Sequence, residues 1–262
     1  MIKIKINKLL NENQQPVGDD QQTRALLNTN LQKNRSMYPY ANPKGIDFII
    51  NNVQPLQNNK IVKFLGGGLY GIAFQLSNDH VLKLFVDSFS GKDQAYYSAY
   101  KNALFSKKGS PYLPTIYTTG TVMFYNIPLS YVEMNKVIPF EEWLKKTGRG
   151  GKIKAADQIC SNLIMIMYDI EDLETLTGKK ITNFKQIKQY FGNKQPSIQQ
   201  IVGKIRLSLR SAYIQKIFTK EEIMGIMKAA IEMRKLGIPL HDLHTGNFGV
   251  DPVSQAIVIY DN

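Results

Sequence analysis

Residues 60–85, KIVKFLGGGLYGIAFQLSNDHVLKLF, contain three short runs that are rich in β-branched, aromatic and aliphatic residues. The runs cover residues 61–65, 72–76 and 81–85, and residues that form turns join them. Glycines separate the first two runs, and Ser-Asn-Asp separates the second from the third, which is the composition of tight turns between paired strands. The stretch therefore predicts an antiparallel meander of three strands.

The flanking segments extend this pattern toward a mixed fold. Residues 115–134 contain two further strand-like runs, broken near residues 126–128, and residues 256–260 contain one more. Helical patterns occupy most of the remaining sequence, namely residues 90–106, 140–146, 155–176, 181–191, 198–217 and 220–236. Because the strands come first and most helices follow, the sequence predicts an α+β fold with two lobes, in which strands and helices are segregated.

The first 59 residues differ in composition from the rest. Asn and Gln account for 18 of the first 60 positions, a polar bias that favours an arm over a packed core. The chain also starts by alternating Ile with Lys, which predicts a short edge strand and not a signal peptide. We interpret residues 1–59 as either a draped tail or a segment that orders on a protein partner. Its candidate anchors are Leu26, Leu27, Tyr38, Tyr40 and Ile49.

Charge and composition exclude several classes of protein. The net charge is +12, and residues 145–220 contain 15 Lys and Arg against 5 Asp and Glu. This basic region predicts a solvated surface or a docking face for nucleic acid, a phosphorylated ligand or an acidic protein. No nucleic-acid-binding motif accompanies it, so direct nucleic-acid binding is not favoured.

Cys160 is the only cysteine, and no run approaches the roughly 18 apolar residues of a membrane span. We expect a cytoplasmic protein, or one assembled from the cytoplasm into a larger particle.

A glycine pattern lies between the first two predicted strands. Gly66, Gly68 and Gly71 fit G-x-G-x-x-G, and Ala73 follows two positions later. Since both flanking segments are strands, the pattern predicts a hairpin and not the strand-to-helix turn of a dinucleotide-binding fold. Glycines at such a hairpin allow main-chain N–H groups to approach phosphate oxygens. A hairpin without a ligand is the alternative interpretation.

Lys83 lies inside the apolar run of residues 81–85. Burying a lysine among core residues is unfavourable unless an anion pairs with it, so this position suggests a waiting phosphate or carboxylate. A lysine that points outward from an edge strand would explain the same pattern.

A third group of polar residues lies near the end of the sequence. Residues 238–249 read IPLHDLHTGNFG, and Asp261 follows the last predicted strand. Asp242, Asn247 and Asp261 would supply a base, a carboxamide and a carboxylate if they converge on one point. Magnesium prefers a few such oxygens together with substrate phosphates. The alternative is a helix-to-strand connection that is merely rich in turn formers.

In order and spacing these motifs resemble those of the protein-kinase-like superfamily. The sequence of the loop near the end of the chain is most similar to that of the aminoglycoside-phosphotransferase and atypical kinase branches. The D-L-H-x-G-N loop of that superfamily is matched by residues 242–247, its glycine-rich loop by residues 66–73 and its strand-three lysine by Lys83. Its metal-binding D-F-G aspartate is matched by Asp261. Residues 131–137 look like the hinge between lobes. The resemblance covers residues 60–146 and 219–262.

The resemblance implies a two-lobed kinase-like fold with a small antiparallel β N-lobe and a reduced, mostly helical C-lobe. The N-lobe would comprise residues 60–135 and the C-lobe residues 136–262, with a basic insertion at residues 150–218 and a catalytic-type loop at residues 241–249. The resemblance also implies binding of ATP and Mg²⁺. The glycines and Ala73 would cover the nucleotide phosphates, and Glu133 and Met134 would lie at the adenine.

The resemblance also implies roles for the charged residues. Lys83 would neutralise phosphate charge, and Asp242 would orient or deprotonate the acceptor hydroxyl. Asn247 and Asp261 would hold magnesium. Phosphoryl transfer requires mainly positioning and charge neutralisation from the protein, so this short set would suffice.

The sequence departs from the kinase pattern in three places. The predicted helix within residues 92–106 contains no glutamate to clamp Lys83, and Asp93 is its only acid. Leu240 replaces the histidine of H-R-D. The sequence ends one residue after Asp261, so we expect no activation segment and expect residues 150–218 to fold back as a substitute helical C-lobe.

These departures leave two functional hypotheses. The first is an atypical ATP-dependent phosphotransferase that acts on an unidentified acceptor. The second is a catalytically weak or inactive pseudokinase with a structural or assembly role, for example in a bacteriophage particle, whose arm and basic helical region contact other proteins.

Overall fold

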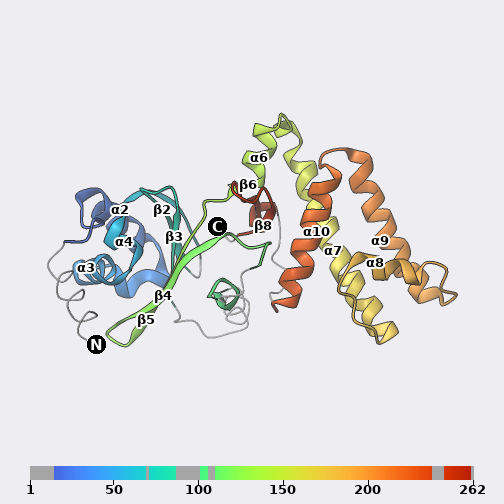
Figure 1. Ribbon diagram of the computed structural model, residues 1–262, viewed down its shortest axis with the longest axis horizontal. Helices are drawn as coiled ribbons and strands as arrows, with labels where there is room; N and C mark the ends of the chain where they lie inside the picture. The colour runs from blue at the N-terminus through green and yellow to red at the C-terminus, as the bar shows by residue number, and fades with distance from the viewer. Residues whose placement is uncertain (1–14, 69–70, 87–100, 106–109, 238–244, 261–262) are drawn as a thin grey trace, which may run out of the picture. The chain divides into compact units, whose positions relative to one another are not determined.

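A computed structural model describes residues 15–68, 71–86, 101–105, 110–237 and 245–260 of the chain (Figure 1). The chain divides into two compact units. The first falls within Met1–Gly91 and Ile116–Lys136, and the second falls within Lys92–Thr115 and Val137–Asp261. The first unit contains a five-stranded antiparallel sheet, and the second is mostly helical with a small sheet of its own. The predicted α+β class is therefore confirmed.

The larger sheet contains every strand predicted between residues 61 and 134. Its strands are β1 (Ile61–Gly68), β2 (Gly71–Leu76), β3 (Val81–Val86), β4 (Ile116–Phe124) and β5 (Ile127–Met134). Their order in the sheet is β1-β2-β3-β5-β4, and all neighbours are antiparallel. Tyr125 and Asn126 join β4 to β5 with φ values of 46° and 66°. Two successive positive φ values are typical of the two-residue hairpin turn whose twist matches that of the strands.

Helices cover one face of this sheet (Figure 1). They are α2 (Gln21–Lys33), the 3₁₀ helix η1 (Arg35–Tyr40), α3 (Pro43–Asn52) and the short α4 (Pro55–Asn58). Alternate residues of β2, β3 and β5 point into this layer, as the period of two in a strand requires. The core between helices and sheet includes Leu27, Leu31, Tyr40, Ile49, Ile50, Leu56, Phe74, Leu82, Leu84 and Leu129.

The interpretation of residues 1–59 as a separate polar arm is wrong for the described part of that range. Leu27 and Leu31 of α2, like Ile49 and Ile50 of α3, are fully buried against the sheet. Several polar residues that suggested an arm instead stabilise helix ends, and Asn42, for example, accepts the N–H of Gly45 at the start of α3. Residues 1–14, with their predicted edge strand, lie outside the described residues.

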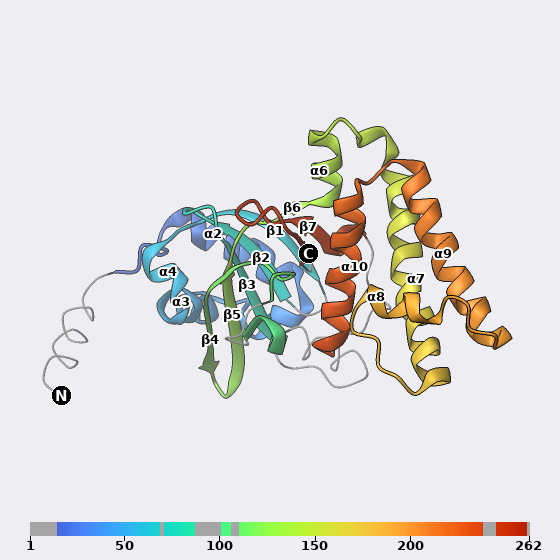
Figure 2. The same cartoon turned by 45° about the vertical axis from the view of Figure 1, so that its right-hand side comes forward.

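The second unit is built mainly from three long helices, α7 (Ile153–Thr177), α9 (Pro196–Gln215) and α10 (Lys220–Lys235). In both views α7 lies between α10 and α9 (Figures 1 and 2). The basic segment 150–218 is therefore helical, as expected, and packs with α10. Where residues 181–191 predicted one helix, the structure has the short α8 (Phe184–Ile187) and the 3₁₀ helix η3 (Lys188–Tyr190). Of the helix predicted at residues 90–106, residues 101–105 are described and helical.

Shorter elements complete the second unit. They are α6 (Phe140–Lys146), the 3₁₀ helices η2 (Gly150–Lys152) and η4 (Thr245–Asn247), and a sheet in the order β6-β7-β8. The strands of this sheet are β6 (Ile138–Pro139), β7 (Phe248–Val250) and β8 (Ile257–Ile259). In the part of the chain that the structure describes, no helix combines the length and apolar character needed to cross a lipid bilayer.

Candidate functional site

The predicted glycine hairpin is present between β1 and β2. Gly66 pairs with Ala73, and Gly68 pairs with Gly71, while residues 69–70 at the tip lie outside the described residues. A Cβ atom at Gly71 would lie 2.2 Å from the main-chain oxygen of Leu84, so strand packing alone requires this glycine. A Cβ atom at Gly66 would meet nothing within 4 Å. Of these two glycines, only Gly66 faces open space that a ligand could use.

Asn34, at the end of α2, holds together the two strand ends next to the tip of this hairpin. Its Nδ2 atom donates to the main-chain oxygens of Gly68, at 3.0 Å, and Gly71, at 3.2 Å. One side chain thus joins the last residue of β1 to the first residue of β2. Sequence reasoning missed Asn34 because its partners lie 34 and 37 positions away. The only local signal is an asparagine directly after a helix.

Lys83 lies in the middle of β3 and is 4% exposed. The strand lies between β2 and β5, and Lys83 pairs with Ala73 on one side and Val132 on the other. The alternative of an outward-pointing lysine on an edge strand is therefore wrong. Since Leu82 and Leu84 belong to the core under the helices, Lys83 points to the opposite face of the sheet. Its Nζ atom lies 5.4 Å from the centre of the Phe85 ring, within the range of a cation–π contact.

Strand register brings most of the predicted first-unit residues to the same face as Lys83. Directly paired residues share a face of a sheet. Ala73 pairs with both Gly66 and Lys83, and Met134 pairs with Val81, two residues before Lys83. The face opposite the helices therefore carries an open glycine, a small alanine, a buried ammonium and a methionine in adjacent positions.

Glu133 is an exception, because its side chain belongs to a different cluster. Its Oε1 atom lies 2.7 Å from Nδ1 of His80 and accepts a 2.9 Å hydrogen bond from Nδ2 of Asn78. Nδ1 of His80 also lies 3.0 Å from Nδ2 of Asn78, so the three side chains form one cluster. The His80 ring stacks on Tyr117 with centroids 3.9 Å apart. The carboxylate of Glu133 thus fixes the β2–β3 turn, and only the main chain of Glu133 remains available for the predicted hinge role.

In the second unit, Asn247 lies at the end of η4 and is buried. Its main-chain oxygen accepts a 2.8 Å hydrogen bond from the N–H of Tyr260. The bond continues the ladder between β7 and β8, in which Phe248 pairs with Ile259. The structure therefore brings the end of β8 next to Asn247. Asp242 and Asp261, the other two members of this predicted set, lie outside the described residues.

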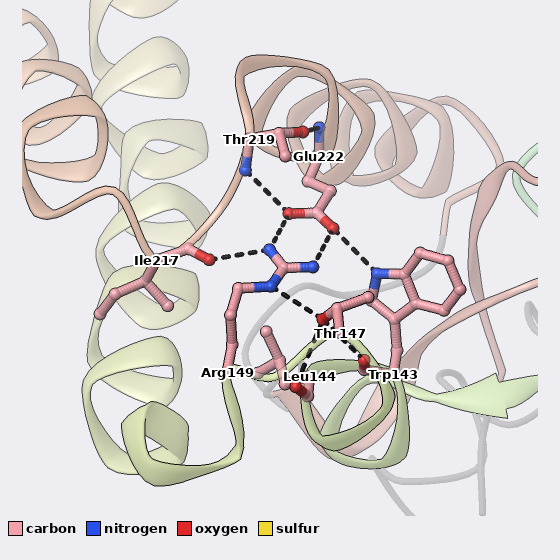
Figure 3. Close-up of polar contacts among 7 residues, drawn as sticks. All are labelled: Trp143, Leu144, Thr147, Arg149, Ile217, Thr219 and Glu222. Carbon is pink, nitrogen blue, oxygen red and sulfur yellow. Dashed lines mark hydrogen bonds and ion pairs between the residues drawn. The ribbon is translucent and has the colours of Figure 1, made fainter.

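Helix α10, which precedes the predicted catalytic-type loop, is anchored at its first turn by Glu222 (Figure 3). The carboxylate of Glu222 accepts two hydrogen bonds from Arg149, at 2.6 and 2.8 Å, and one of 2.9 Å from Nε1 of Trp143. It also accepts the N–H of Thr219 in a capping box. Burial by itself raises the pKa of Glu222, but these hydrogen bonds outweigh that effect and hold the pKa below its ordinary value.

The other end of α10 is anchored by Arg234. Its guanidinium is paired with Glu174 of α7 and lies 3.2 Å from the carboxylate of Glu171, which is also on α7. Both ends of α10 are therefore fixed by arginine–glutamate pairs, one to the segment after α6 and one to α7.

The described residues alone do not supply a metal site. Among them, no group of three or more His, Cys, Asp and Glu side chains is placed to bind a metal ion. Asn247 contributes one amide group, whose oxygen is a suitable ligand for Mg²⁺. In comparisons with known proteins, the chain matches no protein-family model and no curated protein sequence.

Proposed function

We propose that this protein is an atypical, kinase-like phosphotransferase that uses ATP and Mg²⁺, with a two-lobed arrangement of its units. The observation that carries the proposal is the burial of Lys83 on the same sheet face as the glycine hairpin. Lys83 lies on a central strand, is 4% exposed and shares this face with Gly66 and Ala73, so its ammonium group is suited to contact a nucleotide phosphate held at the hairpin.

The glycine hairpin supports the same proposal. Gly66 leaves open space above the sheet face that carries Lys83, so a phosphate group could approach the main chain there without meeting a side chain. Asn34 bonds both strands of the hairpin next to its tip, so less conformational freedom would be lost there when a ligand binds. Ala73 lies between Gly66 and Lys83 in the sheet, and its small side chain leaves room above the sheet between these two residues.

The second-unit residues would supply the remaining chemistry. Bound ATP provides the phosphoryl group, and Mg²⁺ offsets the charge of its oxygens. The carboxamide of Asn247 and the carboxylate of Asp261 would bind the metal, and Asp261 directly follows Tyr260, whose N–H is bonded to Asn247. Asp242 would orient the acceptor hydroxyl or accept its proton.

The proposal is tested by measuring ATP consumption in the presence of Mg²⁺ for the wild-type protein and for Asp242→Ala. We expect turnover by the wild type and a loss of at least about 100-fold in the variant, the usual size of a general-base contribution. Asp172→Ala, which removes an exposed carboxylate on α7, is the matched control and retains wild-type turnover. Equal turnover in Asp242→Ala and the wild type would contradict the assignment.

A second candidate function is that of a kinase-like assembly protein without catalysis. It is favoured by the excess of Lys and Arg over Asp and Glu in residues 145–220 and by the absence of glutamate from residues 92–106, where a kinase carries the partner of its lysine. This alternative predicts that the protein is a stoichiometric component of a larger complex and consumes no ATP. Bound nucleotide in a freely soluble monomer would count against it.

A further inference from the structure

Helix α9 has one face buried on α7 and a second face that is exposed and carries apolar side chains. Ile198, Ile201, Val202 and Ile205 are buried, which accounts for the packing on α7. On the other face Leu207 is 68% exposed and Ile214 is 64% exposed. They are seven residues apart, so they lie on the same side of the helix two turns apart. Tyr213, also exposed, lies beside Ile214.

Arginines are interleaved with these apolar residues. Arg210 lies between Leu207 and Ile214 on the helix surface, and Arg206 lies one turn before Arg210. Arg206 stacks on the exposed ring of Phe191, with 5.4 Å between the guanidinium carbon and the ring centre. Within the described part of the chain, neither arginine forms an ion pair. We call the set Phe191, Arg206, Leu207, Arg210, Tyr213 and Ile214 the α9 face.

The sequence around the α9 face is strongly one-sided in charge. Residues 175–220 contain ten Lys and Arg and no Asp or Glu. Because α9 itself contains no acidic residue, its arginines have no compensating charge on their own helix. The face combines exposed aliphatic residues with arginines that form no ion pair among the described residues, a combination that no solvent-facing helix needs for its own stability.

We infer that the α9 face is a docking surface for an acidic amphipathic helix of a partner protein. Such a helix would place apolar residues against Leu207 and Ile214 and carboxylates against Arg206 and Arg210, which matches both the exposed apolar side chains of the surface and its charge. This inference goes beyond the proposed phosphotransferase activity and does not depend on it.

The composition of the face disfavours other occupants. A nucleic acid would satisfy the arginines, but its phosphates would leave Leu207 and Ile214 without apolar contacts. A membrane-surface helix inserts a broad apolar face, whereas the main apolar face of α9 is already buried on α7. A second copy of this chain would bring two surfaces of the same positive sign together.

The test uses a synthetic peptide of about 20 residues, long enough to form a helix, with leucines at positions i, i+3, i+4 and i+7 flanked by glutamates. Its affinity for the full-length protein is measured by fluorescence anisotropy at two salt concentrations. The matched control peptides are a scrambled sequence, in which the leucines no longer share a face, and a version with lysine in place of each glutamate. Single-stranded DNA and phosphatidylserine vesicles are titrated as competing probes.

We expect the acidic amphipathic peptide to bind the wild type at least tenfold more tightly than either control peptide. The double variants Leu207→Ser/Ile214→Ser and Arg206→Glu/Arg210→Glu should each weaken binding at least tenfold. Lys179→Glu/Lys180→Glu makes the same charge change on exposed residues outside α9 and should alter affinity less than threefold.

Several results would overturn the inference. They are no binding of the acidic peptide by the wild type, unchanged binding by Leu207→Ser/Ile214→Ser, and tighter binding of DNA or vesicles than of the peptide. Circular dichroism of each variant checks that its fold is retained, which we expect because all six substituted positions are exposed. Because none of these readouts involves ATP, failure here is distinguishable from failure of the proposed activity.

Discussion

Arg149 and Glu222 form a two-point ion pair across 73 residues of sequence, with nitrogen–oxygen distances of 2.6 and 2.8 Å (Figure 3). The same guanidinium donates to the main-chain oxygen of Ile217, and the same carboxylate accepts from Trp143. The pair therefore joins the segment after α6, the α9–α10 connection and the first turn of α10.

Removing Arg149 should destabilise the second unit strongly. Arg149→Ala leaves the mostly buried carboxylate of Glu222 without its main partner, and we expect the free energy of unfolding to fall by about 3 kcal/mol. Chemical denaturation measures this change. Lys146→Ala is the control, because it removes an exposed i,i+4 pair with Glu142 and should cost less than about 0.5 kcal/mol. A similar loss of unfolding free energy in both variants would show that the Arg149–Glu222 pair stabilises the protein no more than an exposed ion pair does.

Glu222 should make the stability of the protein depend on pH. Its pKa is lower in the folded state than its ordinary value of about 4.3, so the folded state favours the charged form. The resulting stabilisation is fully present above that ordinary value and is lost as the pH falls through the folded-state pKa. The difference in unfolding free energy between the wild type and Glu222→Gln should therefore be largest near neutral pH and shrink in acid. A difference that stays constant from pH 7 to pH 3 would contradict this account.

Substitution of two glycines of the hairpin should have different effects on stability. Gly71→Ala places a methyl group against the main-chain oxygen of Leu84 and should destabilise the first unit by about 1–3 kcal/mol. Gly66→Ala meets open space and should change stability by less than about 1 kcal/mol. If the hairpin covers phosphates, Gly66→Ala should nevertheless weaken ATP binding, as isothermal titration calorimetry can measure. Unchanged ATP affinity in a folded Gly66→Ala protein would remove the glycine hairpin from the site.

Cys160 provides a probe of the second unit. It is fully buried in α7, and burial raises the pKa of its thiol, so the reactive thiolate is scarce in the folded state. Alkylation should therefore proceed only through unfolding and should accelerate in Arg149→Ala as stability falls. Mass spectrometry over time measures the rate, with the protein in denaturant as the fully reactive control. Rapid labelling of the native wild type would show that α7 is not packed as described.

Local sequence patterns predicted the strands of the large sheet and the long helices well, because these depend on periodicity within a few residues. The polar composition of residues 1–59 misled the prediction, since residues such as Asn42 serve as helix caps while Leu27 and Ile49 reach the core. Composition does not distinguish a capping asparagine from one in a solvated arm.

The parts of the site that could not be predicted depend on contacts between distant residues. Whether Lys83 is buried depends on β5 pairing with β3, which places it in a central strand. The bonds from Asn34 to the hairpin and from Arg149 to Glu222 span 34 to 73 positions. By contrast, the shared face of Ala73 and Lys83 follows directly from alternation once the hairpin pairing is known.

The most direct test of the central claim is a titration of ATP in the presence and absence of Mg²⁺, comparing the wild type with Lys83→Met. Methionine has a similar volume and suits a buried position, so the variant should fold. The account predicts Mg²⁺-dependent ATP binding by the wild type and at least a tenfold loss of affinity in Lys83→Met. Equal affinity in the two proteins, or no binding by the wild type, would contradict it.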